Sequence, residues 1–342
     1  MTRRLTALLL AALLLVVAGC GGGKSSSGTS LDDQLGYLPK DAPLVGVIET
    51  NPESGQLRNL DKLASKFLLA GQVKAELKKS IAQGGVDFDK DVKPLLGGQL
   101  VIGSPDVRSL TDSEPRDAYV VAWGVKDGDK LRDLIKKQGK SKESGKVAGQ
   151  TAFEASDGSV VVVKGDLLVG ASDRPTLQAA FDRHDGGDKL TQSQFDDAFG
   201  DLPKLALARV YGNLQKLLEA DPAAATARQV KWVAGLRTFA VTVTAENDGP
   251  AVDASINTDG LSANDLPLAP GDEAPRVARI GEFGVGLRNA QQLSAFVQST
   301  LRAVDPSQFA SFARGKKVIG RAAGIDIDGD LIGQLTGATS IS

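Results

Sequence analysis

The chain has 342 residues, of which 42% are hydrophobic, 5% aromatic and 24% charged, and its formal net charge is −2. This near balance argues against nucleic acid as a partner, because a phosphate backbone is bound by an excess of lysine and arginine. A single cysteine excludes an internal disulfide framework, and a single histidine excludes a metal site built from several imidazoles. The composition predicts no cofactor.

The first residues have the features of a secretory signal. Arg3 and Arg4 form a basic start, and an apolar run over residues 8–17 follows it. The run is too short for a membrane span, because a helix needs about 20 apolar residues to cross the hydrocarbon core. We interpret residues 1–19 as a signal peptide and predict an exported protein.

The next residues resemble the lipobox of bacterial lipoproteins. In Val17-Ala18-Gly19-Cys20, small residues stand directly before the cysteine. In lipoproteins the thiol of this cysteine receives a diacylglyceryl group and the cysteine becomes the mature N-terminus, so the resemblance implies a lipid anchor at Cys20. Two acyl chains hold a protein stably where one holds it marginally. An ordinary signal peptide with an incidental cysteine is the alternative.

Residues 20–34 predict a flexible tether between this anchor and a folded body. Residues 21–30 read GGGKSSSGTS, a composition that buries little apolar surface and behaves as a flexible coil. The predicted location is therefore the outer face of the bacterial cell membrane, within the cell envelope.

From about residue 35 the chain mixes strand and helix patterns. Alternating or β-branched runs predict strands at residues 42–50, 118–125, 205–212 and 283–287, a three-stranded meander over 151–172 and a hairpin over 237–259. Amphipathic stretches predict helices at 57–69, 213–219 and 290–304, one capped by Asp127 or Asp129, and one opened by Asp173-Arg174-Pro175. We predict an α+β fold with antiparallel or mixed sheets and helices packed on one face.

One segment occurs twice. GVDFDKDVKPLLGG at residues 85–98 returns without a gap as GIDIDGDLIGQLTG at residues 324–337. Upstream, Val45-Gly46-Val47 matches Phe283-Gly284-Val285, and an amphipathic helix precedes each segment. We predict a tandem duplication, with a first unit over 35–260 and the start of a second over 261–342. We expect the second copy to be incomplete, either because the chain is a fragment, which we favour, or because the second unit is degenerate.

Each copy carries a ladder of alternating aspartates: Asp87, Asp89, Asp91 and Asp326, Asp328, Asp330. An EF-hand loop needs glycine at position 6 and a bidentate glutamate at position 12. The residues found there are Val92 and Gly98 in the first copy, with Leu331 and Gly337 in the second. We interpret the ladders as helix starts, in which aspartate caps the first turn. A weak cation site of another kind remains the alternative.

The body of the chain resembles a family of bacterial exported proteins that is catalogued as a domain of unknown function. The features shared are Leu-Pro-x-Asp-Ala-Pro before the first strand, the aspartate ladder running into a glycine-bounded strand, and Asp-Leu-Leu-Val-Gly-Ala-Ser before an Arg-Pro-x-Leu helix. The resemblance covers most of residues 35–342. It implies an envelope location and a repeated α+β build, and it carries no functional residues.

Two further features could carry function. The basic run over residues 130–146 is a solvated face or a contact for anionic lipid or wall polymer, with Lys136, Lys137, Lys140 and Lys142 as the candidates. His184 follows a predicted helix and is interpreted as a solvated helix end. Its use as the base of a serine hydrolase is the alternative.

Our leading hypothesis is a lipid-anchored envelope protein that is not an enzyme and acts as a binding or structural module. Its partners would be the membrane, through the lipid on Cys20, and an envelope protein, polymer or lipid. A carrier of a lipid or other apolar ligand is the second hypothesis, and an envelope hydrolase is the third.

Overall fold

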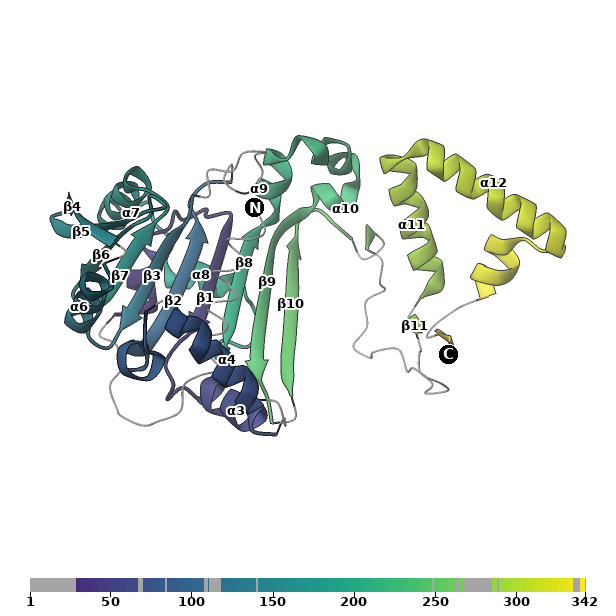
Figure 1. The fold of residues 1–342 in the computed structure, drawn as a ribbon. Coiled ribbons are helices and arrows are strands. Elements are labelled where there is room, and N and C mark those ends of the chain that lie inside the picture. Colours follow the sequence, from purple (N-terminus) through teal and green to yellow (C-terminus); the bar gives the residue numbers. More distant parts are fainter. Residues whose placement is uncertain are drawn as a thin grey trace. The chain divides into compact units, whose positions relative to one another are not determined.

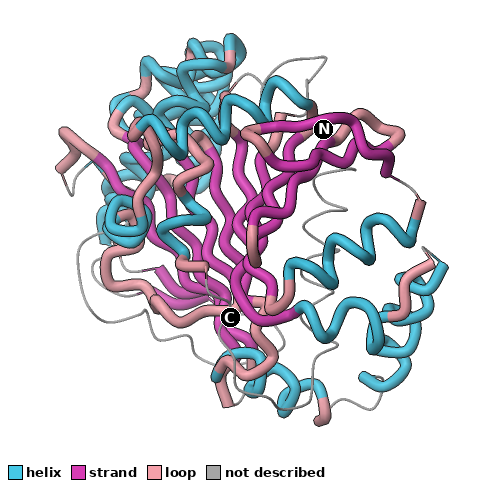
Figure 2. The backbone as a smooth tube through the Cα atoms, turned by 90° about the vertical axis from the view of Figure 1, so that its left-hand side faces the viewer, coloured by secondary structure: helices cyan, strands magenta, loops and turns pink. Residues whose placement is uncertain are grey.

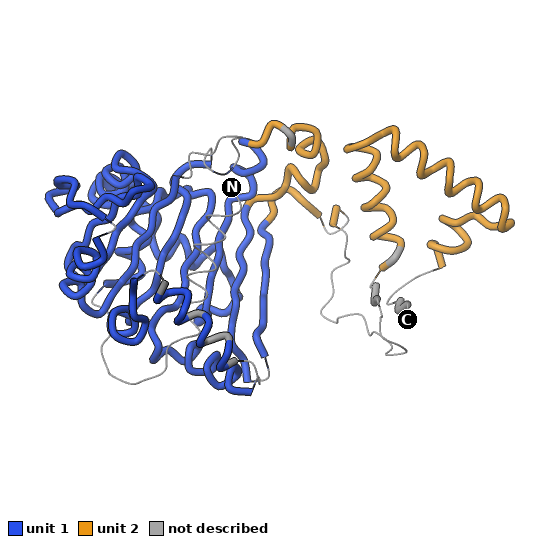
Figure 3. Tube along the Cα trace, in the orientation of Figure 1, with its two compact units in different colours: residues 1–220, 238–257 blue, residues 221–237, 258–342 orange. Residues whose placement is uncertain are grey.

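The computed structural model of the protein describes residues 29–66, 70–83, 85–107, 110, 118–139, 141–247, 249–262, 265–266, 285–287, 289–334 and 339–341. The signal peptide, the lipobox with Cys20, most of the tether and Lys140 lie outside these residues. The chain forms two compact units (Figure 3). Unit 1 comprises residues 1–220 and 238–257, and unit 2 comprises residues 221–237 and 258–342.

Unit 1 is built on one ten-stranded antiparallel sheet with the order β10-β9-β8-β1-β2-β3-β7-β6-β5-β4 (Figure 1). Its strands are β1 (Leu44–Glu49), β2 (Leu96–Ser104), β3 (Val120–Val125), β4 (Ser141–Val147), β5 (Gln150–Ala155), β6 (Val160–Lys164), β7 (Leu167–Ala171), β8 (Ala208–Asn213), β9 (Leu236–Ala245) and β10 (Pro250–Thr258). The strands run side by side as a twisted band (Figure 2), as expected from the right-handed twist of L-peptide strands.

The meander predicted over residues 151–172 is present as β5, β6 and β7. Gly158 and Gly165 lie in its two turns with φ of 87° and 58°, the left-handed region that glycine enters without steric cost. The hairpin over residues 237–259 is present as β9 and β10, and the Glu246 N–H donates to the Gly249 carbonyl at its turn.

The helices of unit 1 are α2 (Leu31–Leu35), α3 (Gly55–Ala64), α4 (Ala70–Gln83), α6 (Gly128–Gln138), α7 (Arg174–Gly186), α8 (Gln192–Asp197) and α9 (Leu214–Ala220), with the short turns η1 (Phe88–Val92) and η2 (Lys93–Leu95). Most of these helices lie on predicted amphipathic stretches, but α2 and α8 are not among the predicted ones, and the helix predicted over 57–69 ends at Ala64. Asp127 caps α6 and Asp173 caps α7, because each carboxylate accepts a backbone N–H of the first turn.

The larger hydrophobic cluster lies between one face of the sheet and α2, α7 and α8. Val160 and Val162 of β6 belong to it, together with Leu177 and Phe181 of α7 and Phe195 of α8. The spacing of Leu177 and Phe181 by four residues puts both on the buried side of α7.

The opposite face is also covered. Val163 of β6 points away from Val162, because successive strand residues face opposite sides, and it packs with Leu131 of α6. Ile48 of β1 packs with Leu57 of α3 in the same way. The α+β class is confirmed, but the helices lie on both faces of the sheet and not on one. Figure 1 shows α3 in front of the strands and α8 behind them.

Two local predictions differ from the structure. Strand β4 was not expected, because it is an edge strand whose residues are mostly exposed and so lack an apolar alternation. The glycine that closes the repeated segment in the first copy, Gly98, belongs to no helix start and lies inside β2, which begins at Leu96. The Gly98 carbonyl accepts bonds from the Thr50 N–H and hydroxyl.

In unit 2 the described elements are mainly helical. They are η3 (Pro222–Ala225), η4 (Ala227–Gln229), α10 (Lys231–Ala234), α11 (Ala290–Val304), α12 (Pro306–Ala323), η6 (Ile327–Leu331), η7 (Ile332–Gln334) and the paired strands β11 (Val285–Leu287) and β12 (Thr339–Ile341). Trp232 packs against Phe296 at 5.4 Å between ring centroids, and its indole N–H donates to Thr300. Within the described part of the chain, no helix combines the length and apolarity needed to cross a bilayer.

The strand pair of unit 2 has the same register as the central pair of unit 1. In unit 1, Gly46 faces Ile102, and in unit 2, Val285 faces Ile341; each residue of the second pair stands 239 positions after its counterpart. The sequence match aligns Gly46 with Gly284, which lies outside the described residues, whereas the strand register aligns Gly46 with Val285. Backbone pairing corrects it, because register is fixed by ladder hydrogen bonds and not by where a glycine falls.

Candidate functional site

The first aspartate ladder forms a closed set of hydrogen bonds at the start of η1, a single turn of π-helix. The Asp87 carboxylate accepts the N–H groups of Asp89 and Lys90, each at 3.0 Å. The Asp91 carboxylate reaches back and accepts the Asp87 N–H at 2.8 Å, and the Asp89 carboxylate pairs with Lys78 at 2.6 Å. Asp87 and Asp91 therefore satisfy backbone donors of the helix start, as the capping interpretation requires, and Asp89 joins it to α4 through Lys78.

The second ladder repeats these bonds at η6. The Asp326 carboxylate accepts the Asp328 N–H at 3.1 Å, and the Asp330 carboxylate accepts the Asp326 N–H at 2.7 Å. Asp328 pairs with Lys316 of α12 at 2.5 Å. One difference is apolar. In the first ladder Phe88 is buried and Val92 packs against the same cluster, whereas their counterparts in the second are Ile327, which is half-buried, and Leu331, which is 50% exposed.

The main role of the two ladders is therefore to cap the helix starts. Among the described residues no group of three or more histidine, cysteine, aspartate or glutamate side chains is arranged to hold a metal ion. The carboxylates at both ladders point at backbone N–H groups and lysines, which are donors that compete with a cation for the same oxygens.

The described candidate lysines of the basic run are divided between two elements. Lys136 and Lys137 lie on α6, Lys142 lies on β4, and Lys140 is outside the described residues. Lys136 pairs with Glu143 at 3.3 Å, and Lys137 lies 3.9 Å from Asp91. These partners reduce the positive charge that the run offers to an anionic surface.

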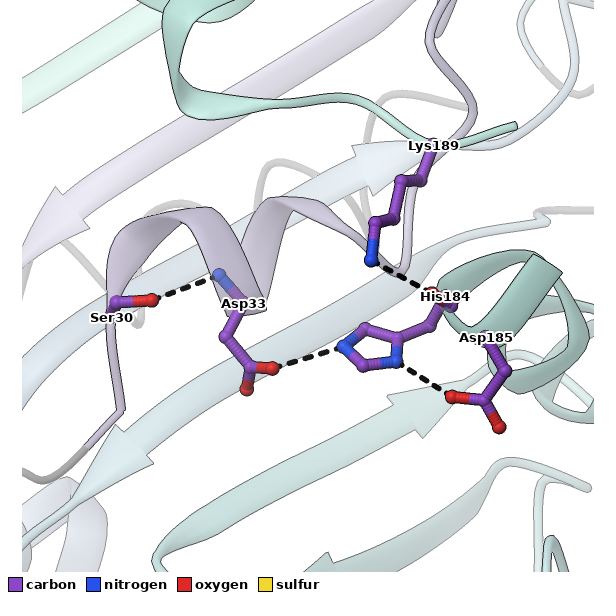
Figure 4. A network of polar contacts seen from close by, with 5 residues as sticks. All are labelled: Ser30, Asp33, His184, Asp185 and Lys189. Carbon is purple, nitrogen blue, oxygen red and sulfur yellow. Dashed lines mark hydrogen bonds and ion pairs between the residues drawn. The ribbon is translucent and has the colours of Figure 1, made fainter. Parts of the chain in front are cut away.

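His184 lies at the end of α7 and joins it to α2 (Figure 4). Its Nε2 is 3.0 Å from an Asp33 oxygen and its Nδ1 is 3.0 Å from an Asp185 oxygen. A neutral ring donates from one nitrogen only, whereas the imidazolium donates to both carboxylates. The ring stacks on Tyr37 with centroids 4.4 Å apart, and Lys189 donates to the His184 carbonyl.

The charges around this cluster shift its neighbours. The hydrogen bond from His184 holds the pKa of Asp185 below its ordinary range. Burial raises the pKa of Tyr37 well above its ordinary value, and the negative charges of Asp33 and Asp185 add to the rise. With both ring nitrogens held by carboxylates, His184 is a clamp between two helices, and it is not set up to take a proton from a serine.

A small polar cavity lies where β1, β2 and β8 meet the start of α3. It measures about 170 Å³, and its lining includes Glu49, Gln99, Lys204 and Arg209. Arg209 is buried, pairs with Asp196 at 2.6 Å and stacks over Phe195. The sequence interpretation missed this site, although an arginine inside the apolar strand of residues 205–212 was a signal for it. The volume is below the roughly 300–1,000 Å³ of ordinary ligand pockets.

Glu49 lines this cavity, and the pKa of its carboxyl is shifted. Burial raises the pKa of its carboxyl, while the N–H groups of Asn51 and Thr50 partly oppose the rise. The Asn51 N–H donates to the Glu49 carboxylate at 2.7 Å.

A family model described as "Protein of unknown function (DUF3352)" matches residues 5–341. The chain belongs to this family. No curated protein matches the chain. Membership confirms the resemblance to a domain of unknown function that the sequence motifs indicated, and it assigns no chemistry to DUF3352 residues.

Solved structures with weak overall similarity are crystal forms of the protein TP0453. Crystal form III has a TM-score of 0.39 and 10% sequence identity, and the match covers 68% of this chain and 82% of that one. Crystal form I has a TM-score of 0.38 and 13% identity, with coverage of 68% and 81%.

The capping interpretation of the ladders predicts a difference between two substitutions. Asp87→Ala removes the acceptor and should lower the free energy of unfolding by about 0.5–2 kcal/mol, whereas Asp87→Asn keeps an acceptor oxygen and should stay near wild type. Urea denaturation with calcium and with a chelator measures both. A calcium-dependent gain in stability that both substitutions abolish would identify a cation site instead.

The clamp interpretation of His184 predicts a loss of stability on substitution. His184→Ala removes the ring stack and both carboxylate contacts, and should lower the free energy of unfolding by about 1–3 kcal/mol. The control is Asp182→Ala, an exposed position on the same helix. If His184→Ala left stability unchanged but abolished a hydrolytic activity of the purified protein, the hydrolase hypothesis would replace the clamp.

The buried carboxyl of Glu49 predicts a pH dependence. Because its pKa is raised in the folded state, that state holds the proton more tightly, and stability falls as pH rises above about 4.3, the ordinary glutamate value, through the folded-state pKa. Glu49→Gln should flatten this fall and stabilise the protein at neutral pH. Urea denaturation across that range, with the exposed Glu246→Gln as control, measures it. A steeper fall in Glu49→Gln would contradict the prediction.

Proposed function

We propose that this member of the DUF3352 family is an exported, lipid-anchored envelope protein that acts as a binding or structural module. The observation that carries the proposal is the small-residue stretch ending in Cys20 behind a basic and apolar leader. A diacylated cysteine would hold the protein at the membrane, and the glycine- and serine-rich residues 21–30 would let the folded part move above it.

The packing of unit 1 favours a module over a carrier. Hydrophobic clusters fill both faces of the sheet in the described residues, with α7 and α8 on one side and α3 and α6 on the other. A carrier encloses an apolar cavity of ligand size. The groups described above act as caps, clamps and buried pairs, which are structural roles, so surface recognition is the function we propose.

We also propose that unit 2 contains a second copy of the β1–β2 region. Three observations support it: the shared register of β11–β12, the matching hydrogen bonds of η6, and the left-handed glycines before each ladder, Gly85 with φ of 81° and Gly324 with φ of 70°. Two copies of one scaffold can present different surfaces, because residues that face solvent are free of the packing constraint.

The anchor proposal predicts a dependence of lipid attachment on one thiol. Fed a clickable fatty acid, cells should label the wild-type chain, and Cys20→Ser should abolish the label and release the protein from the membrane fraction. A matched control, Cys20→Ser with Ser25→Cys, restores a thiol outside the lipobox and should stay unlabelled. Labelling of the control, or of Cys20→Ser itself, would overturn the anchor assignment.

A further inference from the structure

Unit 2 exposes far more large apolar side chains than its size explains. In the described part of the chain they are Val297, Val304, Phe312, Val318, Ile319, Ile325 and Leu331, against Leu205, Val252 and Ile256 in unit 1. Single exposed apolar residues are ordinary, but a contiguous group marks an interaction surface.

On α12 these side chains form one contiguous stripe. Phe312, Gly315, Ile319 and Ala322 are spaced by three and four residues, which places them along one side of a helix. Val318 lies beside them. Phe312, Val318 and Ile319 are 44%, 66% and 62% exposed. We call Phe312, Gly315, Val318, Ile319 and Ala322 the α12 stripe.

Basic residues flank the α12 stripe. Helix α12 contains Arg314, Lys316, Lys317 and Arg321 and no acidic residue. Lys316 is engaged by Asp328, whereas Arg314, Lys317 and Arg321 are exposed on the side of the helix next to Val318. The aspartates of the second ladder begin only after the helix ends, at Asp326.

The first copy provides an internal comparison. With the offset of 239 residues fixed by the strand register, helix α4 places Glu76, Lys79 and Ser80 where α12 has Gly315, Val318 and Ile319. Glu76, Lys79 and Ser80 are exposed, and the first two form an ion pair. At these three positions the first copy is polar where the second is not, although Val73 stands at the place of Phe312, so folding of the repeated unit does not require apolar side chains at the places of Val318 and Ile319.

We propose that the α12 stripe docks on an anionic phospholipid surface. An exposed apolar stripe beside a row of arginine and lysine is the pattern of a helix that lies in the membrane interface, with the apolar side among the acyl chains and the basic side against the lipid phosphates. The proposal is separate from the lipid on Cys20, because it rests on α12 alone. The stripe would contact the same bilayer in which the proposed anchor at Cys20 is inserted.

The test compares one fluorescent probe at two matched positions. In the full chain with Cys20→Ser, which leaves no other thiol, Ile319→Cys and Ser80→Cys are each labelled with an environment-sensitive dye. Any binding through residues 1–19 is the same in both proteins. Vesicles of phosphatidylglycerol should shift the emission of the probe at residue 319 to the blue, and vesicles of phosphatidylcholine should shift it much less. The probe at residue 80 should stay unshifted.

The same vesicle assay tests the role of the basic residues on α12. Arg314→Glu, Lys317→Glu and Arg321→Glu together should abolish the shift at residue 319, with circular dichroism as the check on folding, and high salt should weaken it in the unaltered helix. Equal shifts at residues 80 and 319, or none at 319, would overturn the proposal. So would a blue-shifted probe at 319 without vesicles, because the stripe would then be covered by the protein itself or by a second copy.

Discussion

The pairing of β1 with β2 is the interaction on which the rest of unit 1 depends. Each strand pairs on its other side as well, β1 with β8 and β2 with β3. The pair therefore joins two wings of the sheet, β8-β9-β10 and β3-β7-β6-β5-β4. Alternation of side chains along these strands then decides which residues face each layer of helices, and one slip in register would exchange the two cores.

Most polar side chains that could suggest a binding or catalytic site make structural contacts within the protein. The aspartate ladders close two helix starts, His184 joins α7 to α2, and the buried Arg209 joins β8 to α8 through Asp196. Each places a charge beside a hydrogen-bond partner: at the exposed ladders these are helix-start N–H groups and lysines, and at His184 and Arg209 they are partly buried carboxylates. Because these groups are occupied within the protein, exposed side chains elsewhere are the ones available to contact a partner.

Helices α4 and α12 differ in the residues that they expose to solvent. In the proposed alignment of the two copies, Lys79 and Ser80 of α4 stand where α12 has Val318 and Ile319. Exposed apolar side chains cost solubility and add nothing to the core of their own unit, so a role in contact with another surface accounts for them.

The sequence alone determined the elements that rest on local chemistry. The cap at Asp173, the meander with turns at Gly158 and Gly165, and helix α11 follow from turn and capping residues and from apolar periodicity, which are properties of neighbouring residues. For α6 the sequence offered Asp127 or Asp129, and the structure selected Asp127. Only the tertiary structure decided what depends on residues far apart in the chain. Helices on both faces, the polar edge strand β4, the one-residue correction of the repeat and the partners of His184 all arise from pairing and packing between segments that the sequence does not place together.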